Sequence, residues 1–208
     1  MSTEMAIFVV VVIAVVGWFA LGTHINVRKG HRFLEWLQAG LPLMGGKTTL
    51  RWLGSSVVQL QIANAHEPFR SVEILIVLEP RDVPPLWLLS RMRGRRDLLI
   101  VRTQLRDVPK SQLEILHTEA WSTQTVEREV KDLNWELTES QPFRIYARQL
   151  VVNPSDLVAT AAQTRLELLR LGVRRSDHAF ELHWRLPSQP ASSSRDVFQV
   201  IQALAQRV

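Results

Sequence analysis

The hydrophobic pattern of the chain begins with a long uninterrupted apolar run. Residues 5–22 read MAIFVVVVIAVVGWFALG and contain no charged residue and no proline. A helix of about 20 apolar residues crosses the hydrocarbon core of a bilayer. Because a helix satisfies its own backbone hydrogen bonds inside lipid, the many valines do not oppose it there. The run therefore predicts a transmembrane helix over residues 5–23.

A cleaved signal peptide and a buried core helix are the two alternatives to a membrane anchor. Ala20-Leu21-Gly22 resembles a small-x-small cleavage site. A signal peptide, however, has a basic N-terminal region, and the residues before the run include Glu4 but no Lys or Arg. A core helix normally carries a polar face, which this run lacks. The pattern favours a retained anchor.

The mixed pattern of residues 24–47 predicts an amphipathic juxtamembrane segment followed by a hinge. Residues 28–39 read RKGHRFLEWLQA and have one apolar and one basic side. Beside a membrane span, such a helix can lie on the lipid headgroups; a linker helix packed on the domain fits the pattern equally well. Residues 40–47 contain three glycines and a proline, which predict a flexible joint. A soluble domain is expected over residues 48–208.

Period-two alternation and short apolar runs predict strands in the rest of the chain. Residues 179–186 alternate most clearly, with Phe180 and Trp184 on one face and His183 on the other. The apolar run at residues 71–78 predicts a central strand that is buried on both faces. Residues 119–141 are expected to be mostly loop. The remaining predicted strands cover residues 58–63, 97–105, 112–117 and 143–150.

Two helices are predicted in the C-terminal half of the chain. The first begins at Asn153-Pro154, an N-cap followed by proline at the first helical position, and its apolar residues recur at helical spacing to Leu169, with Gly172 as the stop. The second begins at Ser193, with Asp196 three residues later. Clustered strands with few helices indicate an α+β fold with a single mixed or antiparallel sheet.

The charge pattern predicts the orientation of the anchor. The 208 residues carry 25 Lys and Arg against 20 Asp and Glu, a net charge of +5. No basic residue precedes the apolar run, whereas Arg28, Lys29 and Arg32 follow it. The positive-inside rule therefore places the N-terminus outside and the main domain in the cytoplasm. The absence of cysteine excludes disulfides and thiolate chemistry.

Residues 84–96, PPLWLLSRMRGRR, combine a short apolar helix around Trp87 with a cluster of arginines. One interpretation is a helix whose apolar side packs on the sheet while its arginines are solvated or paired with local acids. A second is contact with the headgroups of an anionic membrane, and a third is a surface for a protein partner. The basic residues of this segment are Arg91, Arg93, Arg95 and Arg96.

No motif in the sequence identifies a reaction. Gly40 and Gly46-Lys47 resemble a phosphate loop, but five residues separate the two glycines where that loop has four. Glu181 and His183 share a strand face, but a metal site needs a third ligand, and the sequence does not fix the place of one. There is no G-x-S-x-G elbow. We therefore predict no cofactor and no metal site.

The favoured hypothesis is a membrane-tethered, non-enzymatic interaction or assembly domain. Its expected partners are the lipid bilayer and other membrane proteins rather than nucleic acid. One alternative is an enzyme or small-ligand binder with a deep pocket joining His117, His183 and a carboxylate; the other is a domain that contacts anionic lipid. The residues predicted to contact the membrane or a partner are Trp18, Arg28, Lys29, Arg32, Trp36, Trp87, Arg91, Arg93, Arg95 and Arg96.

Overall fold

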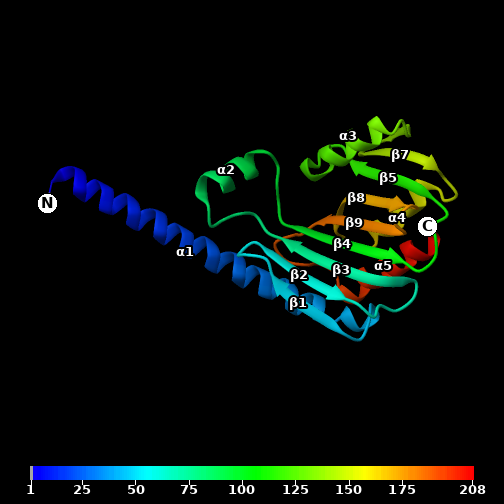
Figure 1. Cartoon of the computed structure of the whole chain (residues 1–208), viewed down its shortest axis with the longest axis horizontal. Helices are drawn as coiled ribbons and strands as arrows, with labels where there is room; N and C mark the ends of the chain where they lie inside the picture. Colours follow the sequence, from blue (N-terminus) through cyan, green and yellow to red (C-terminus); the bar gives the residue numbers. More distant parts are fainter. Residues whose placement is uncertain (1) are drawn as a thin grey trace.

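The apolar run and the basic segment after it form one continuous helix, α1 (Thr3–Gln38). The computed structural model, which describes residues 2–208, shows α1 projecting from a sheet domain, with the N-terminus far from the rest of the molecule (Figure 1). The side chains of the first half of α1 are exposed, and the helix is long and apolar enough to cross a membrane. The second half packs on the domain.

Within residues 2–208, nine antiparallel strands form one sheet in the order β1-β2-β3-β4-β9-β8-β5-β7-β6. The hairpin formed by the last two strands lies in the middle, because β9 pairs with β4 and β8 pairs with β5. The predicted α+β fold is confirmed. The strands are β1 (Thr48–Trp52), β2 (Val57–Ile62), β3 (Phe69–Val77), β4 (Leu98–Leu105), β5 (Gln112–His117), β6 (Glu136–Ser140), β7 (Phe143–Gln149), β8 (Glu167–Arg174) and β9 (Ala179–Arg185).

One face of the sheet is covered by the second half of α1 together with α4 (Pro154–Ala162) and α5 (Ser194–Arg207). The core beneath them includes Phe33 of α1, Trp184 of β9 and Phe198 of α5, each at most 1% exposed. The opposite face is more polar. In the described chain, α3 (Gln124–Asp132) covers one end of that face through a smaller apolar cluster.

The segment predicted as an amphipathic helix and a hinge is part of the folded domain. Residues 28–38 continue α1 without a break, and Phe33 and Leu37 are fully buried or nearly so. Of the two interpretations of this segment, the structure therefore shows a helix packed on the domain. The expected flexible joint contains a short 3-10 helix, η1 (Leu41–Leu43), and Met44 is fully buried after it.

The prediction of a helix from Pro154 to Leu169 is wrong in its second half. α4 ends at Ala162, and the chain turns at Arg165, whose φ of 57° lies in the left-handed region. The residues that follow form β8, where pairing with strands on both sides satisfies the backbone. Gly172 lies in this strand and does not end a helix: a Cβ there would lie 2.7 Å from a carboxylate oxygen of Glu114.

Residues 119–141 also contain more regular structure than was predicted. A 3-10 helix, η2 (Trp121–Thr123), leads into α3, and β6 follows at the edge of the sheet. Helix α3 is mostly charged and has too few apolar residues to show a helical period in the sequence, although Val130 is fully buried. The short helix predicted around Trp87 is present as α2 (Pro84–Met92), with proline at its first position.

Candidate functional site

α1 leaves the sheet domain beside the loop that joins β3 to α2. A Cβ on Gly22 would lie 2.3 Å from the carbonyl oxygen of Arg81, so the two backbones approach this closely because residue 22 is glycine. One turn earlier, Trp18 donates its indole N–H to the same carbonyl oxygen over 3.0 Å. Helix and loop are therefore in direct contact where the exposed half of α1 begins.

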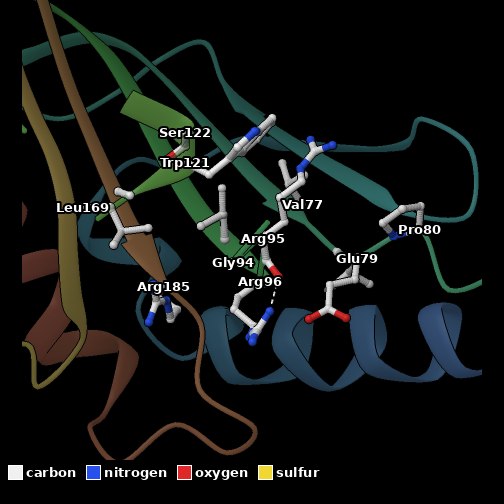
Figure 2. Close-up of a pocket in the computed structure, with 13 residues that line it drawn as sticks. Val77, Glu79, Pro80, Gly94, Arg95, Arg96, Trp121, Ser122, Leu169 and Arg185 are labelled. Atoms are coloured by element: carbon white, nitrogen blue, oxygen red, sulfur yellow. Dashed lines mark hydrogen bonds between the residues drawn. The ribbon is translucent and has the colours of Figure 1, made fainter. Parts of the chain in front are cut away.

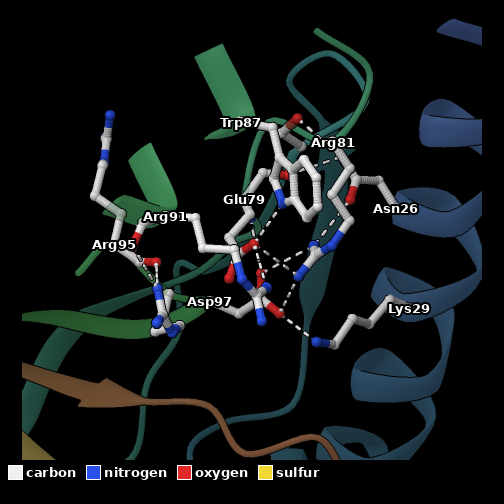
Figure 3. Close-up of polar contacts among 10 residues, drawn as sticks. Asn26, Lys29, Glu79, Arg81, Trp87, Arg91, Arg95 and Asp97 are labelled. Carbon is white, nitrogen blue, oxygen red and sulfur yellow. Dashed lines mark hydrogen bonds and ion pairs between the residues drawn. The ribbon is translucent and has the colours of Figure 1, made fainter. Parts of the chain in front are cut away.

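A set of polar side chains, largely buried, attaches α1 to the sheet (Figure 3). We call it the junction cluster; its members are Asn26, Lys29, Glu79, Arg81 and Asp97. Asp97 is 3% exposed, pairs with Lys29, and accepts two hydrogen bonds of 3.1 Å from Arg81. Asn26 is fully buried; it donates to the carbonyl oxygen of Glu79 over 3.1 Å and accepts from Arg81 over 3.0 Å. Because these five residues share partners, α1 cannot pivot without breaking several buried polar contacts.

The charges of the junction cluster keep Asp97 ionised. Burial alone would raise the pKa of this carboxyl, but hydrogen bonds from Arg81, Lys29 and the backbone of Glu79 outweigh burial and lower the pKa below its usual value. A carboxylate whose pKa falls on folding stabilises the protein above the unfolded-state pKa of about 3.9. This stability is lost as the pH falls through the folded-state pKa. The cluster thus makes the attachment of α1 sensitive to acid.

α2 lies beside the exposed half of α1 and leaves its own apolar side chains on the surface. Trp87 anchors it: its indole N–H donates to Oε2 of Glu79 over 2.7 Å, and its ring centroid is 6.2 Å from that of Trp18. The interpretation that the apolar side of α2 packs on the sheet is therefore wrong, since Ser90 is the buried residue of this helix. The exposed apolar residues, at 47–76%, are Leu86, Leu88, Leu89 and Met92.

The four arginines of the α2 segment have different surroundings. Arg91 lies 3.4 Å from Oε2 of Glu79. Arg93 is exposed, and Arg96 donates to the carbonyl oxygens of Arg91 and Arg95. The guanidinium of Arg95 stacks on Trp121, 3.6 Å from the ring centroid. The segment thus belongs to two sites, the junction cluster and the pocket described next.

A cavity of about 40 Å³ lies where the loop between α2 and β4 faces η2 (Figure 2). We call it the arginine pocket. Its apolar lining includes Val77, Leu98, Ala120 and Leu169. Its polar lining is formed by Arg95, Arg96, Ser122 and Arg185, with Trp121 beside them and Glu79 at its edge. The sequence drew attention to the arginines, but nothing in it linked them to Trp121 and Ser122.

The other predicted contact residues lie farther along α1. Arg28 and Arg32 are exposed, whereas Lys29 is directed into the junction cluster. Trp36 was expected at the membrane interface, but it packs against the core and donates its indole N–H to the carbonyl oxygen of Ser192 over 2.9 Å. This tryptophan therefore has a role in attaching α1 to the segment before α5.

The less covered face of the sheet carries a chain of ion pairs. Fully buried Glu114 accepts two hydrogen bonds of 2.9 Å from Arg170, which also lies 3.0 Å from Glu181. Glu181 in turn contacts His183 at 2.8 Å and Arg102 at 2.9 Å. Burial acts to raise the pKa of Glu181, but these partners lower it far below its usual value. A shallow groove of about 470 Å³ lies beside this chain.

The residues considered for metal or catalytic chemistry do not form a centre. His183 pairs with Glu181, as their shared strand face predicted. His117 lies at the end of β5, where its ring meets Phe143 edge-on at 5.5 Å, and it does not line either cavity described above. Within residues 2–208, no three His, Asp or Glu side chains are placed to hold a metal ion.

The sequence of this chain matches no protein-family model and no curated protein. Four features of the structure bear on its function: a helix long enough to cross a membrane, a junction cluster that attaches this helix to the sheet, an exposed apolar helix beside it and a small basic pocket.

Proposed function

We propose that this is a single-pass membrane protein whose domain is a non-enzymatic interaction or assembly module on the cytoplasmic side. Two helices attach it to the bilayer: α1 crosses the membrane, and the apolar side of α2 enters the headgroup region. The observation that carries the proposal is the exposed apolar surface of α2 beside the exposed half of α1.

Three features of this surface favour lipid as its solvent. The ring of Trp87 on α2 lies beside the ring of Trp18 on α1, and aromatic rings favour the membrane interface. The leucines of α2 continue the apolar surface from there. Arginines follow at the end of α2, and each basic group near an anionic surface contributes about 1 kcal/mol of attraction.

The junction cluster supports the interaction role. Because Lys29 and Asn26 of α1 bind Asp97 and the backbone of Glu79, the domain keeps one angle to the helix that anchors it. The groove on the less covered sheet face is lined by Gln61, Glu73 and Gln104 among others. This groove is then presented at a fixed height and angle, which suits binding to another membrane protein.

Single-cysteine variants test the membrane contact, because the natural chain has no cysteine. We expect a fluorophore on Leu88→Cys, at a position 54% exposed on α2, to be quenched by lipids that carry a brominated acyl chain in nanodiscs. The control is Val108→Cys, at a position 49% exposed between β4 and β5, where we expect no quenching. Equal quenching at the two positions would contradict the attachment through α2.

The same control variant tests the orientation. A membrane-impermeant maleimide is expected to label Val108→Cys in inverted membrane vesicles and not in right-side-out vesicles. Labelling from the outside would place the domain on the other side of the membrane and overturn the positive-inside argument.

A photo-crosslinking amino acid tests the interaction role. Placed at Gln104 in the groove, it is expected to form a discrete adduct with another membrane protein in the membranes of producing cells. The matched control is Gln163, an exposed glutamine at the end of α4, where no adduct is expected. The interaction role is wrong if Gln104 gives no adduct or the two positions give the same pattern.

A further inference from the structure

We propose that the arginine pocket is a binding site for a phosphate group, carried by an anionic lipid headgroup or by a soluble phosphate ester. The lipid source rests on the membrane attachment proposed above, whereas the phosphate site itself does not. Four properties of the pocket support this site: its size, its charge, its unpaired polar atoms and its place in the fold.

The size of the pocket selects a small group. One bound water needs about 10–15 Å³ of this kind of volume, so a cavity of about 40 Å³ accommodates roughly three such groups. A phosphate that points its oxygens inward matches this space. Sites for drug-sized molecules or nucleotides enclose about 300 Å³ or more, so the remainder of a larger ligand has to lie outside the pocket.

The charge of the pocket selects an anion. Within residues 2–208, Arg95 has no carboxylate within 4.0 Å. The only carboxylate on the lining, Glu79, is already engaged by Arg81 and Arg91. Stacking on Trp121 holds the guanidinium plane of Arg95 and leaves its N–H groups free at the edge, the geometry with which arginine binds phosphate.

Unpaired polar atoms in the lining give an independent indication of a ligand. Ser122 Oγ and Arg185 Nε are both buried and have no hydrogen-bond partner in the described chain. A buried donor without a partner is costly, and an oxyanion in the cavity offers such a donor an acceptor. The Nη1 atom of Arg185 is paired with Glu167 at 2.9 Å, which leaves its Nε as the unpaired donor. Burial and the charge of Arg93 also lower the pKa of Arg95. Both effects disfavour the charged form of its guanidinium, and a bound anion favours that form.

The place of the pocket favours a headgroup as the source of the phosphate. Glu79 and Pro80 line it and belong to the loop that leads into α2 (Figure 2). Arg81 of the same loop contacts Trp18 of α1. The pocket therefore opens at the end of the sheet from which α1 emerges. A lipid lying against α2 can direct its phosphate to Arg95 without entering the pocket with its acyl chains.

Thermal unfolding of the full-length protein in a neutral detergent tests the site with three probes. Dihexanoyl phosphatidic acid carries both the phosphate and short acyl chains, glycerol 3-phosphate carries the phosphate alone, and dihexanoylglycerol carries the chains alone. A ligand that binds the folded state raises the Tm in proportion to its occupancy. The variants are Arg95→Gln in the pocket and Arg148→Gln as the control, which removes one charge from an exposed arginine of β7 that lies outside the pocket lining.

We expect phosphatidic acid to raise the Tm of the natural protein and dihexanoylglycerol to leave it unchanged. Arg95→Gln is expected to weaken the apparent affinity about tenfold, the effect of a lost charge-assisted hydrogen bond, and Arg148→Gln by less than about twofold. A shift with glycerol 3-phosphate as large as the lipid shift assigns the site to a soluble ester. A shift with the lipid alone assigns it to the membrane.

The proposal is overturned if neither phosphate probe raises the Tm, if dihexanoylglycerol acts as strongly as phosphatidic acid, or if both arginine variants lose affinity equally. Should Arg95→Gln unfold in detergent, Ser122→Ala takes its place and is expected to weaken binding severalfold. Because this titration is carried out without a bilayer, its result is independent of the quenching at Leu88→Cys, and each proposal can fail alone.

Discussion

Asp97 joins two basic side chains that are far apart in the sequence, Lys29 on α1 and Arg81 in the loop before α2. Removing one partner of a buried ion pair leaves the other charge without compensation, which costs about 3–5 kcal/mol. We therefore expect Asp97→Asn to lower the free energy of unfolding by about 3 kcal/mol, measured by urea denaturation in neutral detergent at pH 7. Asp107→Asn, at an exposed aspartate between β4 and β5, is the control and should change it by less than about 0.5 kcal/mol.

The pH dependence of the same pair distinguishes lost charge from lost packing. The folded-state pKa of Asp97 is lowered, so its contribution is complete above the unfolded-state pKa of about 3.9 and declines below it. The stability difference between the natural protein and Asp97→Asn is expected to shrink as the pH is lowered from about 5 to 2. A difference that stays constant over this range would mean that the charge of Asp97 does not stabilise the junction.

The residue-level sites show where sequence reasoning ends. The arginines of residues 84–96 are evident as a group, because all four lie within six residues of the chain. Their partners are not evident from the sequence: Trp121 reaches Arg95 from η2, and Glu79, in the loop after β3, pairs with Arg91. Such contacts depend on the distance between strands in the folded sheet, and no local pattern in one sequence carries that distance.

The packing of α1 depends on glycines on one side of the helix. Gly22 touches the loop before α2, whereas a Cβ on Gly17 would have no neighbour within 4 Å. We expect Gly22→Ala to force α1 away from Arg81 and to destabilise the fold by about 1–3 kcal/mol. Gly17→Ala, in the same helix, should change stability by less than about 1 kcal/mol. Thermal unfolding of both variants in the same detergent measures the difference, and equal effects would show that the contact at Gly22 is not required.

At the level of elements, the strongest patterns gave correct strands. The alternation of residues 179–186 corresponds to β9, and the apolar runs at residues 71–78 and 97–105 correspond to β3 and β4. The prediction was wrong where leucines fit the spacing of a helix as well as that of a strand. Leu166 and Leu169 continue the helical spacing of α4, but Leu166 directly precedes β8 and Leu169 lies within it. Pairing on both sides of β8 decides the outcome there, and this pairing is a property of the whole sheet.

At the scale of the whole molecule, the helix that is long and apolar enough to cross a membrane is also part of the core. Residues 3–21 of α1 are almost entirely exposed, whereas the residues after Gly22 contribute Phe33 and Leu37, each at most 1% exposed. The polar contacts of Asn26 and Lys29 lie on this second half as well. The boundary between the exposed apolar segment and the folded domain therefore falls within α1 and not at the glycines near residue 45.

Two truncations test this boundary. A chain of residues 22–208 keeps every buried contact of α1 and is expected to unfold cooperatively. A chain of residues 48–208 loses three large core side chains, Phe33, Leu37 and Met44, each worth about 2–5 kcal/mol, along with the α1 half of the junction cluster. Since small domains have a total stability of about 5–15 kcal/mol, the shorter chain is expected to show no cooperative thermal transition by circular dichroism.

A shared Tm for the two truncated chains would show that α1 adds nothing to the fold and can move relative to the sheet. The fixed presentation of the groove would then have no physical basis, even if α1 still crossed the membrane. A cooperative transition in the longer chain alone would instead mean that the domain cannot separate from its anchor without unfolding. Position and angle at the membrane would then follow from the same contacts that stabilise the core.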